Sequence, residues 1–140
     1  MRVSTQFPIA VHALLMVAFS PVRVTSDMVA ESAGCNAVII RNIYSKLKKA
    51  GLLSVKTGTG GTALAKPADS ISLWDVYTAV ETDETDEIFK FHNPSENCPV
   101  GSSVRNLLIT HLDNAVKAMN ASLSSVTLKQ LKNELMALHH

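Results

Sequence analysis

The sequence has little cysteine, no long hydrophobic run and almost no net charge, and each shortage excludes a class of protein. Two cysteines, Cys35 and Cys98, are too few for the disulfide framework of a small secreted domain, so we expect free thiols in a reducing cytoplasm. No run of about eighteen apolar residues is present, which argues against a membrane span. The apolar stretch from Phe7 to Phe19 is interrupted by Pro8 and His12 and has no small-residue cleavage site after it. We expect a buried first helix there rather than a signal peptide.

What is present indicates one domain with an oligomerisation arm. The chain has 140 residues, of which 46% are hydrophobic, so it can bury a core. The net charge of +1 conceals an asymmetry. Residues 1–66 contain 8 basic and 2 acidic side chains, whereas residues 67–140 contain 5 basic and 10 acidic ones. A basic first half suggests a surface that faces an anion such as DNA.

Hydrophobic periodicity predicts three helices in the first fifty residues. The first begins near Ser4 or Thr5. The second begins at Thr25 or Ser26 and ends at Gly34. The third follows an Asn36 cap and runs from about Ala37 to Ala50, ending at Gly51. Its expected inward face consists of Ile40, Ile43, Tyr44 and Leu47.

The turn between the second and third helices has the pattern of a helix-turn-helix. Two helices that cross closely need a small residue, and Ala30 stands at that position. The short turn needs glycine, which is Gly34, and its next residue, Cys35, should point inward as a small apolar side chain. In this motif the second helix lies in the major groove of DNA.

A glycine-tipped hairpin follows the helices. Residues 52–57 and 62–66 are predicted as short strands joined at Gly58–Gly61, and Ser72 is expected to cap a short helix. Residues 81–100 are acidic and poorly patterned, which indicates a loop or loosely ordered connector. A long amphipathic helix is expected at about 102–120 and a last helix at about 127–138. The apolar stripe of the long helix comprises Val104, Leu107, Leu108, Leu112, Ala115, Val116 and Met119.

These elements predict a mainly α fold with a small β-wing. We expect residues 1–80 to form a winged helix-turn-helix DNA-binding domain, 81–101 a connector loop, and 102–140 a dimerisation helix with a C-terminal helix. Arginine and asparagine make bidentate contacts to base edges, while lysines suit phosphates or simply a solvated face. Lys48 and Lys49 are in this second group. The predicted DNA contacts are Ser26, Asn36, Ala37, Val38, Arg41, Asn42, Ser45, Lys46, Lys56, Thr57, Thr59, Gly60 and Gly61.

Several short motifs together resemble the Rrf-two (Rrf2, BadM-like) family over nearly the whole chain. They are Ala50-Gly51-Leu52, Gly58-Thr59-Gly60-Gly61, Leu64, Pro67, Ile71, Leu73, Val76 and Ala79-Val80-Glu81. The resemblance implies that the third helix enters the major groove, the wing reaches the minor groove, and the long helix pairs with its copy in a homodimer. The implied function is a sequence-specific transcriptional regulator, by default a repressor, on a pseudo-palindromic operator.

Two departures from the family pattern stand out. Members with an iron–sulfur cluster carry three cysteines in the connector, but here only Cys98 lies there, so we expect no cluster and no other cofactor. A branch of the family that lacks the cluster has a similar pattern to Asn93-Pro94 and Cys98-Pro99-Val100-Gly101 of this chain. After the wing glycines, many members have an aromatic or basic pair, whereas this chain has Thr62-Ala63, so its minor-groove reading should differ.

The signal that controls such a regulator is open at this point. Cys35 and Cys98 are candidates for redox sensing, because helix N-termini favour the thiolate and a partner subunit could bring the two together. Each also has an ordinary explanation, as a small core residue and as an incidental loop residue. The alternative is a small-molecule or protein effector. An enzyme with Cys98 as nucleophile and His92 as base lacks an orienting third group, and the same pair lacks further metal ligands, so we predict neither an enzyme nor a metal site.

Overall fold

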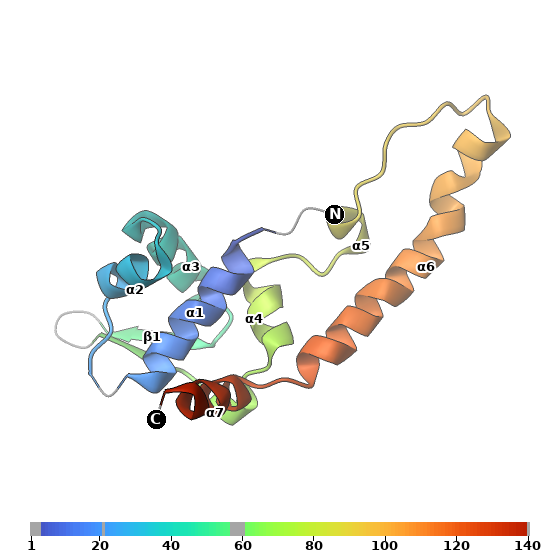
Figure 1. Ribbon diagram of the computed structural model, residues 1–140. Coiled ribbons are helices and arrows are strands. Elements are labelled where there is room, and N and C mark those ends of the chain that lie inside the picture. The colour runs from blue at the N-terminus through green and yellow to red at the C-terminus, as the bar shows by residue number, and fades with distance from the viewer. Residues whose placement is uncertain (1–3, 21, 57–60, 140) are drawn as a thin grey trace.

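The computed structural model describes residues 4–20, 22–56 and 61–139. Figure 1 shows a helical body from which one long helix extends to the side. Its elements in chain order are α1 (Gln6–Phe19), α2 (Ser26–Ala33), α3 (Ala37–Lys49), β1 (Leu53–Lys56), β2 (Gly61–Leu64), the 3₁₀ turn η1 (Ala68–Ser70), α4 (Leu73–Val80), α5 (Thr85–Ile88), α6 (Pro99–Ser124) and α7 (Leu128–Leu138). The mainly α fold with a small two-stranded sheet is the predicted fold class, which is confirmed.

Polar side chains fix where four of the helices begin. Thr25 accepts a hydrogen bond from the Met28 N–H at the start of α2, and Asn36 accepts one from the Ile39 N–H at the start of α3. Ser72 and Thr127 cap α4 and α7 in the same way. Each cap satisfies an amide that has no partner within its own helix. The caps expected at Thr25, Asn36 and Ser72 are therefore confirmed. Thr5, at the start of α1, makes no side-chain cap bond.

Two antiparallel strands form the described part of the wing. Leu53 pairs with Leu64 and Lys56 with Gly61, so the strands are in direct register from their base to Gly61. β1 begins one residue later than expected from the sequence, and β2 spans Gly61–Leu64 where 62–66 was expected. The Thr62 hydroxyl donates to the Val24 carbonyl oxygen at 2.9 Å, which ties β2 to the segment before α2.

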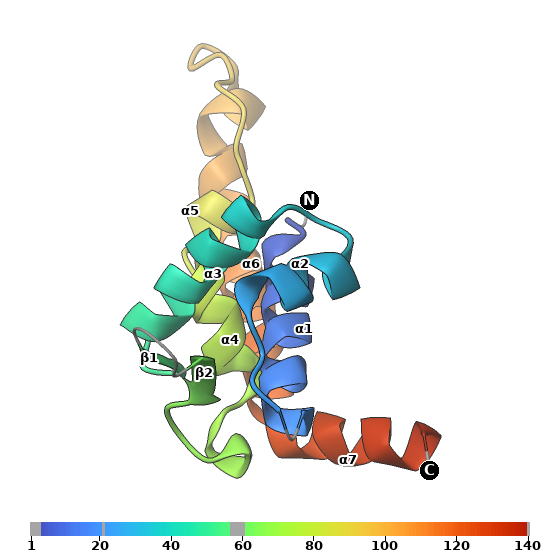
Figure 2. The same cartoon turned by 90° about the vertical axis from the view of Figure 1, so that its left-hand side faces the viewer.

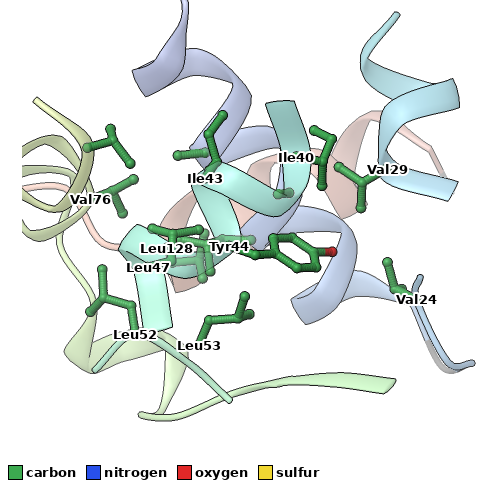
Figure 3. Close-up of a cluster of buried hydrophobic side chains, with 14 of the residues drawn as sticks. Val24, Val29, Ile40, Ile43, Tyr44, Leu47, Leu52, Leu53, Val76 and Leu128 are labelled. Atoms are coloured by element: carbon green, nitrogen blue, oxygen red, sulfur yellow. The ribbon is translucent and has the colours of Figure 1, made fainter. Parts of the chain in front are cut away.

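The hydrophobic core lies between α1, α3 and the base of the wing (Figure 3). Ala10, Ala13 and Leu14 of α1 are buried, which agrees with the expected buried first helix. The described part of the chain contains no helix that is both long enough and apolar enough to cross a membrane. Core residues from the other elements are Val24, Val29, Ala30, Ile40, Ile43, Tyr44, Leu47, Leu52, Leu53, Ile71, Val76, Val80 and Leu128.

The last helix returns to this core. Leu128 N–H donates to the Ile71 carbonyl oxygen at 2.8 Å, and Leu73 N–H donates to the Val126 carbonyl oxygen at 2.9 Å. Leu128 is 1% exposed, and α7 packs against α1 and η1. The sequence predicted α7 as part of the 102–140 dimerisation segment, whereas its Leu128 packs into the core of the N-terminal helices.

The connector is held to α6 by side-chain contacts. It contains the short helix α5, where Arg105 Nη2 of α6 donates to both Oδ1 and Oδ2 of Asp86 at 2.9 Å. Thr85 also donates to Asp113 of α6. Most of the connector is irregular, as expected, and α5 is its one short helix among the described residues, tied to α6 by an acidic and a hydroxyl side chain. The long helix also begins at Pro99, a residue well suited to a first helical position, and runs to Ser124.

Candidate nucleic-acid interface

The turn between α2 and α3 has the geometry of a helix-turn-helix. Gly34 ends α2 with φ of 71°, a conformation that glycine adopts without steric cost. The Cys35 N–H donates to the Ala30 carbonyl oxygen at 3.1 Å, which closes the turn. Cys35 is half-buried and packs against the core, and Ala30 is buried where the two helices meet. The positions assigned to Ala30, Gly34 and Cys35 from the sequence are confirmed.

The inner face of α3 sets the orientation of the helix. Ile40, Ile43 and Leu47 are at most 1% exposed, and Tyr44 is 7% exposed. In Figure 3 these side chains point from α3 into the cluster shared with Val29 of α2. Because the four residues recur at helical spacing, the residues between them must face outward.

The outer face of α3 presents most of the DNA contacts predicted for this helix to solvent. Val38 is 55% exposed, and Arg41 and Asn42 are exposed beside it. Asn36, Ser45 and Lys46 are exposed as well. Arginine and asparagine on such a face have the donor and acceptor groups that read guanine and adenine edges. The structure thus gathers these side chains on one helix surface.

Ala37 differs from the expected arrangement. Its side chain is half-buried and packs against the core, because position 37 is three residues before Ile40 and shares its side of the helix. Ser26, at the start of α2, is also half-buried.

Basic side chains flank the outer face of α3. Lys46, Lys48 and Lys49 are exposed in its last turn, where positive charge also complements the helix dipole. Lys46 Nζ donates to Gln6 Oε1 at 2.6 Å, so the start of α1 orients this lysine. Gln6 was missed in the sequence because forty residues separate it from Lys46, and no local pattern signals such a contact.

A hollow of about 630 Å³ lies between the start of α1 and α3. Ile39, which is 38% exposed, lines it together with Asn42. Ile39 was not among the predicted contacts, although its place next to Val38 on the third helix was a usable signal. The other lining residues are Ser4, Thr5, Gln6, Ile43, Ser45 and Lys46.

The wing contributes only part of its predicted contacts to the described structure. Thr57, Thr59 and Gly60, and the side chain of Lys56, lie outside the described residues. Gly61 is half-buried at the start of β2, with φ of 67°. The side chain of Arg23 lies directly against it, a neighbour that the sequence analysis missed.

The two cysteines lie in different surroundings. Cys98 is exposed immediately before α6, where the backbone N–H groups of Gly101 and Val100 lower the pKa of its thiol. Cys35 sits in the α2–α3 turn. Figure 1 places that turn and the start of α6 on opposite sides of the molecule, so one chain does not bring the two thiols together.

The cysteine set does not fit an iron–sulfur cluster. Cluster iron is held by several thiolates, and Cys98 is the only cysteine in the connector. In the ranges 4–20, 22–56 and 61–139, no three histidine, cysteine or acidic side chains gather where they could hold a metal ion.

Comparisons with known proteins agree on one family. Residues 3–134 match the model of the Rrf2 family, described as "Iron-dependent Transcriptional regulator". The Bacillus subtilis (strain 168) protein named "Putative HTH-type transcriptional regulator YwnA" is 34% identical over 134 residues, which cover 95% of this chain and 98% of that protein. These matches are to transcriptional regulators, not to enzymes.

Solved structures show the same fold. A candidate transcriptional regulator from Lactobacillus plantarum has a TM-score of 0.76 and 27% identity, and the match covers 97% of this chain and 91% of the other. CymR (YrzC), the global cysteine regulator of B. subtilis, has a TM-score of 0.68 and 18% identity, with 95% and 97% covered, and is similar in fold alone. The exposed face of α3, the paired strands and the matches over nearly the full length lead to one conclusion: the chain belongs to the Rrf2 family of transcriptional regulators.

Proposed function

We propose that this chain is a repressor that binds a pseudo-palindromic DNA operator as a homodimer in the cytoplasm. The observation that carries the proposal is the outer face of α3, where Val38, Arg41 and Asn42 are exposed together over a fully buried inner face. Arg41 and Asn42 read base edges in the major groove, and the lysines at the end of α3 contact phosphates. The wing and the start of α2 add contacts to the backbone and the minor groove.

The long helix supports the homodimer. None of its 26 residues is buried within one chain, and Val100, Leu107 and Leu108 are 69%, 65% and 43% exposed. A helix with this much uncovered apolar surface needs a partner. Pairing with a second α6 around a twofold axis presents two copies of α3 to half-sites about 34–36 Å apart, or a multiple of that.

The test is a gel-shift titration on the DNA upstream of the chain's own gene, with an unrelated duplex of equal length as competitor. We expect specific binding, and Arg41→Ala should weaken it by about 1–3 kcal/mol while reducing discrimination at one base position. Lys48→Ala is the matched control, since loss of a phosphate contact should weaken both duplexes alike. Equal binding of both duplexes by the unaltered protein would contradict the proposal.

The signal is proposed to act through thiol oxidation without an iron–sulfur cluster. The lowered pKa of the exposed Cys98 thiol supports this, because the thiolate is the reactive form. With diamide as oxidant, two thiols lose two electrons and two protons to form a disulfide, and diamide takes them up to become the hydrazine. Since one chain keeps the cysteines apart, a Cys35–Cys98 bond must join two chains.

Oxidation in the same gel shift distinguishes this signal from the alternative. Diamide should change binding, dithiothreitol should restore it, and Cys35→Ser or Cys98→Ser should abolish the response. Binding that ignores diamide would favour control by a small-molecule or protein effector, with the DNA-binding proposal intact.

A further inference from the structure

The side chain of Arg23, which lies outside the wing, packs against Gly61 at the start of β2. A Cβ atom placed on Gly61 would stand 2.6 Å from Arg23 Cγ and 3.2 Å from both Cδ and Nε of that side chain. The arginine therefore lies across the first residue of β2, in space that any larger residue at position 61 would take. Arg23 belongs to the segment between α1 and α2, thirty-eight residues away in sequence.

Two further contacts hold this arrangement. The Thr62 hydroxyl donates to the Val24 carbonyl oxygen at 2.9 Å, so the residues next to Arg23 and Gly61 are bonded to each other. Val24 is itself 2% exposed, which anchors the backbone beside Arg23 in the core. Gly61 has φ of 67°, a backbone conformation that other residues adopt with strain. The strand and the arginine thus form one locally fixed unit.

The positively charged Arg23 side chain can bind an anion beside the start of β2. The residue is exposed, and no acidic side chain pairs with it among the ion pairs of the described segments. Its neighbours on β2, Thr62 and Ala63, carry no charge. It also stands two residues before Thr25, the cap of α2, so it shares an edge with the start of the helix-turn-helix.

We infer that Arg23 is a phosphate-binding residue of the DNA interface. Its side chain packs against Gly61 and supplies the positive charge that the second strand of the wing lacks. This inference rests on the proposed function and names a contact that α3 does not supply. The ligand is a phosphodiester of the DNA backbone, which an arginine can contact with two parallel N–H donors. The contact adds affinity at the wing but no base discrimination.

The experiment measures the affinity of the full chain for its operator duplex across a series of salt concentrations. Arg23→Gln keeps most of the stem on Gly61 and removes the charge. We expect the negative slope of log association constant against log salt concentration to become shallower by about 0.9 for each chain bound. This corresponds to roughly eightfold weaker binding per chain at 0.1 M salt. Arg23→Lys should retain the slope. Lys129→Gln on α7 removes one charge elsewhere and should change neither quantity.

A second pair of variants tests the role of Gly61. Gly61→Ala should weaken binding by displacing the arginine, and this effect should largely disappear when Arg23→Gln is already present. An equal effect in both backgrounds would overturn the positioning role of Gly61.

The two proposals fail differently. If the unaltered chain binds its operator but Arg23→Gln leaves the salt slope unchanged, Arg23 does not contact phosphate. If the unaltered chain shows no preference for its operator over an unrelated duplex, the proposed function itself fails.

Discussion

Val38 and Ile40 are two residues apart on α3 and lie in opposite environments. Val38 is 55% exposed, whereas Ile40 is fully buried against α2. We predict that Ile40→Ala lowers the free energy of unfolding by about 2–5 kcal/mol, because it leaves a cavity beneath the helix. Urea denaturation monitored by circular dichroism measures the loss.

Val38→Ala is the matched control for that substitution. It should change the free energy of unfolding by less than about 0.5 kcal/mol, because the removed methyl groups face solvent. It should nonetheless weaken operator binding, since an apolar side chain in the major groove can contact a thymine methyl group. Comparable destabilisation by both variants would mean that the assigned inner and outer faces of α3 are wrong.

Cys98 allows a prediction about pH. The N–H groups of Gly101 and Val100 lower its pKa, so its thiolate persists to lower pH than that of an ordinary cysteine. In a Cys35→Ser variant, the rate of alkylation by iodoacetamide should rise with pH around a midpoint below the usual value of about 8.5. The same variant in concentrated urea is the control and should return to that value. Identical midpoints in both conditions would remove the support that Cys98 gives to redox sensing.

The burial of individual residues could be predicted from the sequence where the hydrophobic periodicity was strong. The four inward residues of α3 follow from helical spacing alone, and their burial agrees with it. Ala37 was assigned to the outer face, but it lies at the boundary, where a small side chain gives little hydrophobic signal. The contacts of Gln6 with Lys46 and of Arg23 with Gly61 depend on tertiary packing, so no local pattern could reveal them.

Among the helices and strands, α3 has its first turn capped by one side chain, Asn36. Asn36 accepts a hydrogen bond from the Ile39 N–H at 3.0 Å. We predict that Asn36→Ala costs about 1 kcal/mol of stability, whereas Asn36→Asp retains the cap and costs little. Thermal unfolding of the two variants measures the difference.

The same two variants separate capping from DNA contact. Asn36→Asp should weaken operator binding despite its normal stability, because it places a negative charge beside the phosphates. Full operator affinity in Asn36→Asp would exclude Asn36 from the interface.

The ends of α2 and α3 were predictable because their caps and Gly34 act locally, whereas α6 extends from Pro99 to Ser124, beyond the expected range of about 102–120. The connections between elements were also harder to predict. The connector was predicted as a loop or loosely ordered segment because its acidic residues lack helical or strand periodicity. Its order comes from Arg105 and Asp113 on α6, which contact Asp86 and Thr85. The place of α7 likewise depends on the bonds of Leu128 and Leu73 across a long sequence separation.

At the scale of the whole molecule, we expect the apolar stripe of α6 to determine whether two chains associate. We predict that Leu107→Glu abolishes self-association, because Leu107 is 65% exposed in one chain and would be buried between two. Sedimentation equilibrium measures the change in mass. Lys117→Gln, on the same helix but outside the stripe, should leave the mass unchanged.

The fold of the single chain should survive the Leu107 substitution. Because no residue of α6 is buried within one chain, the helical circular dichroism of Leu107→Glu should stay near that of the unaltered protein. A chain that remained a dimer after this change would show that α6 is not the dimer contact.

The exposed stripe of α6 also affects how the number of dimers depends on the concentration of the chain. If two chains must meet before both half-sites can be held, the number of working regulators rises with the square of chain concentration wherever single chains predominate. A twofold fall in synthesis would then reduce operator-competent molecules about fourfold. In the proposed dimeric repressor, the uncovered α6 would therefore make repression steeply sensitive to how much protein the cell makes.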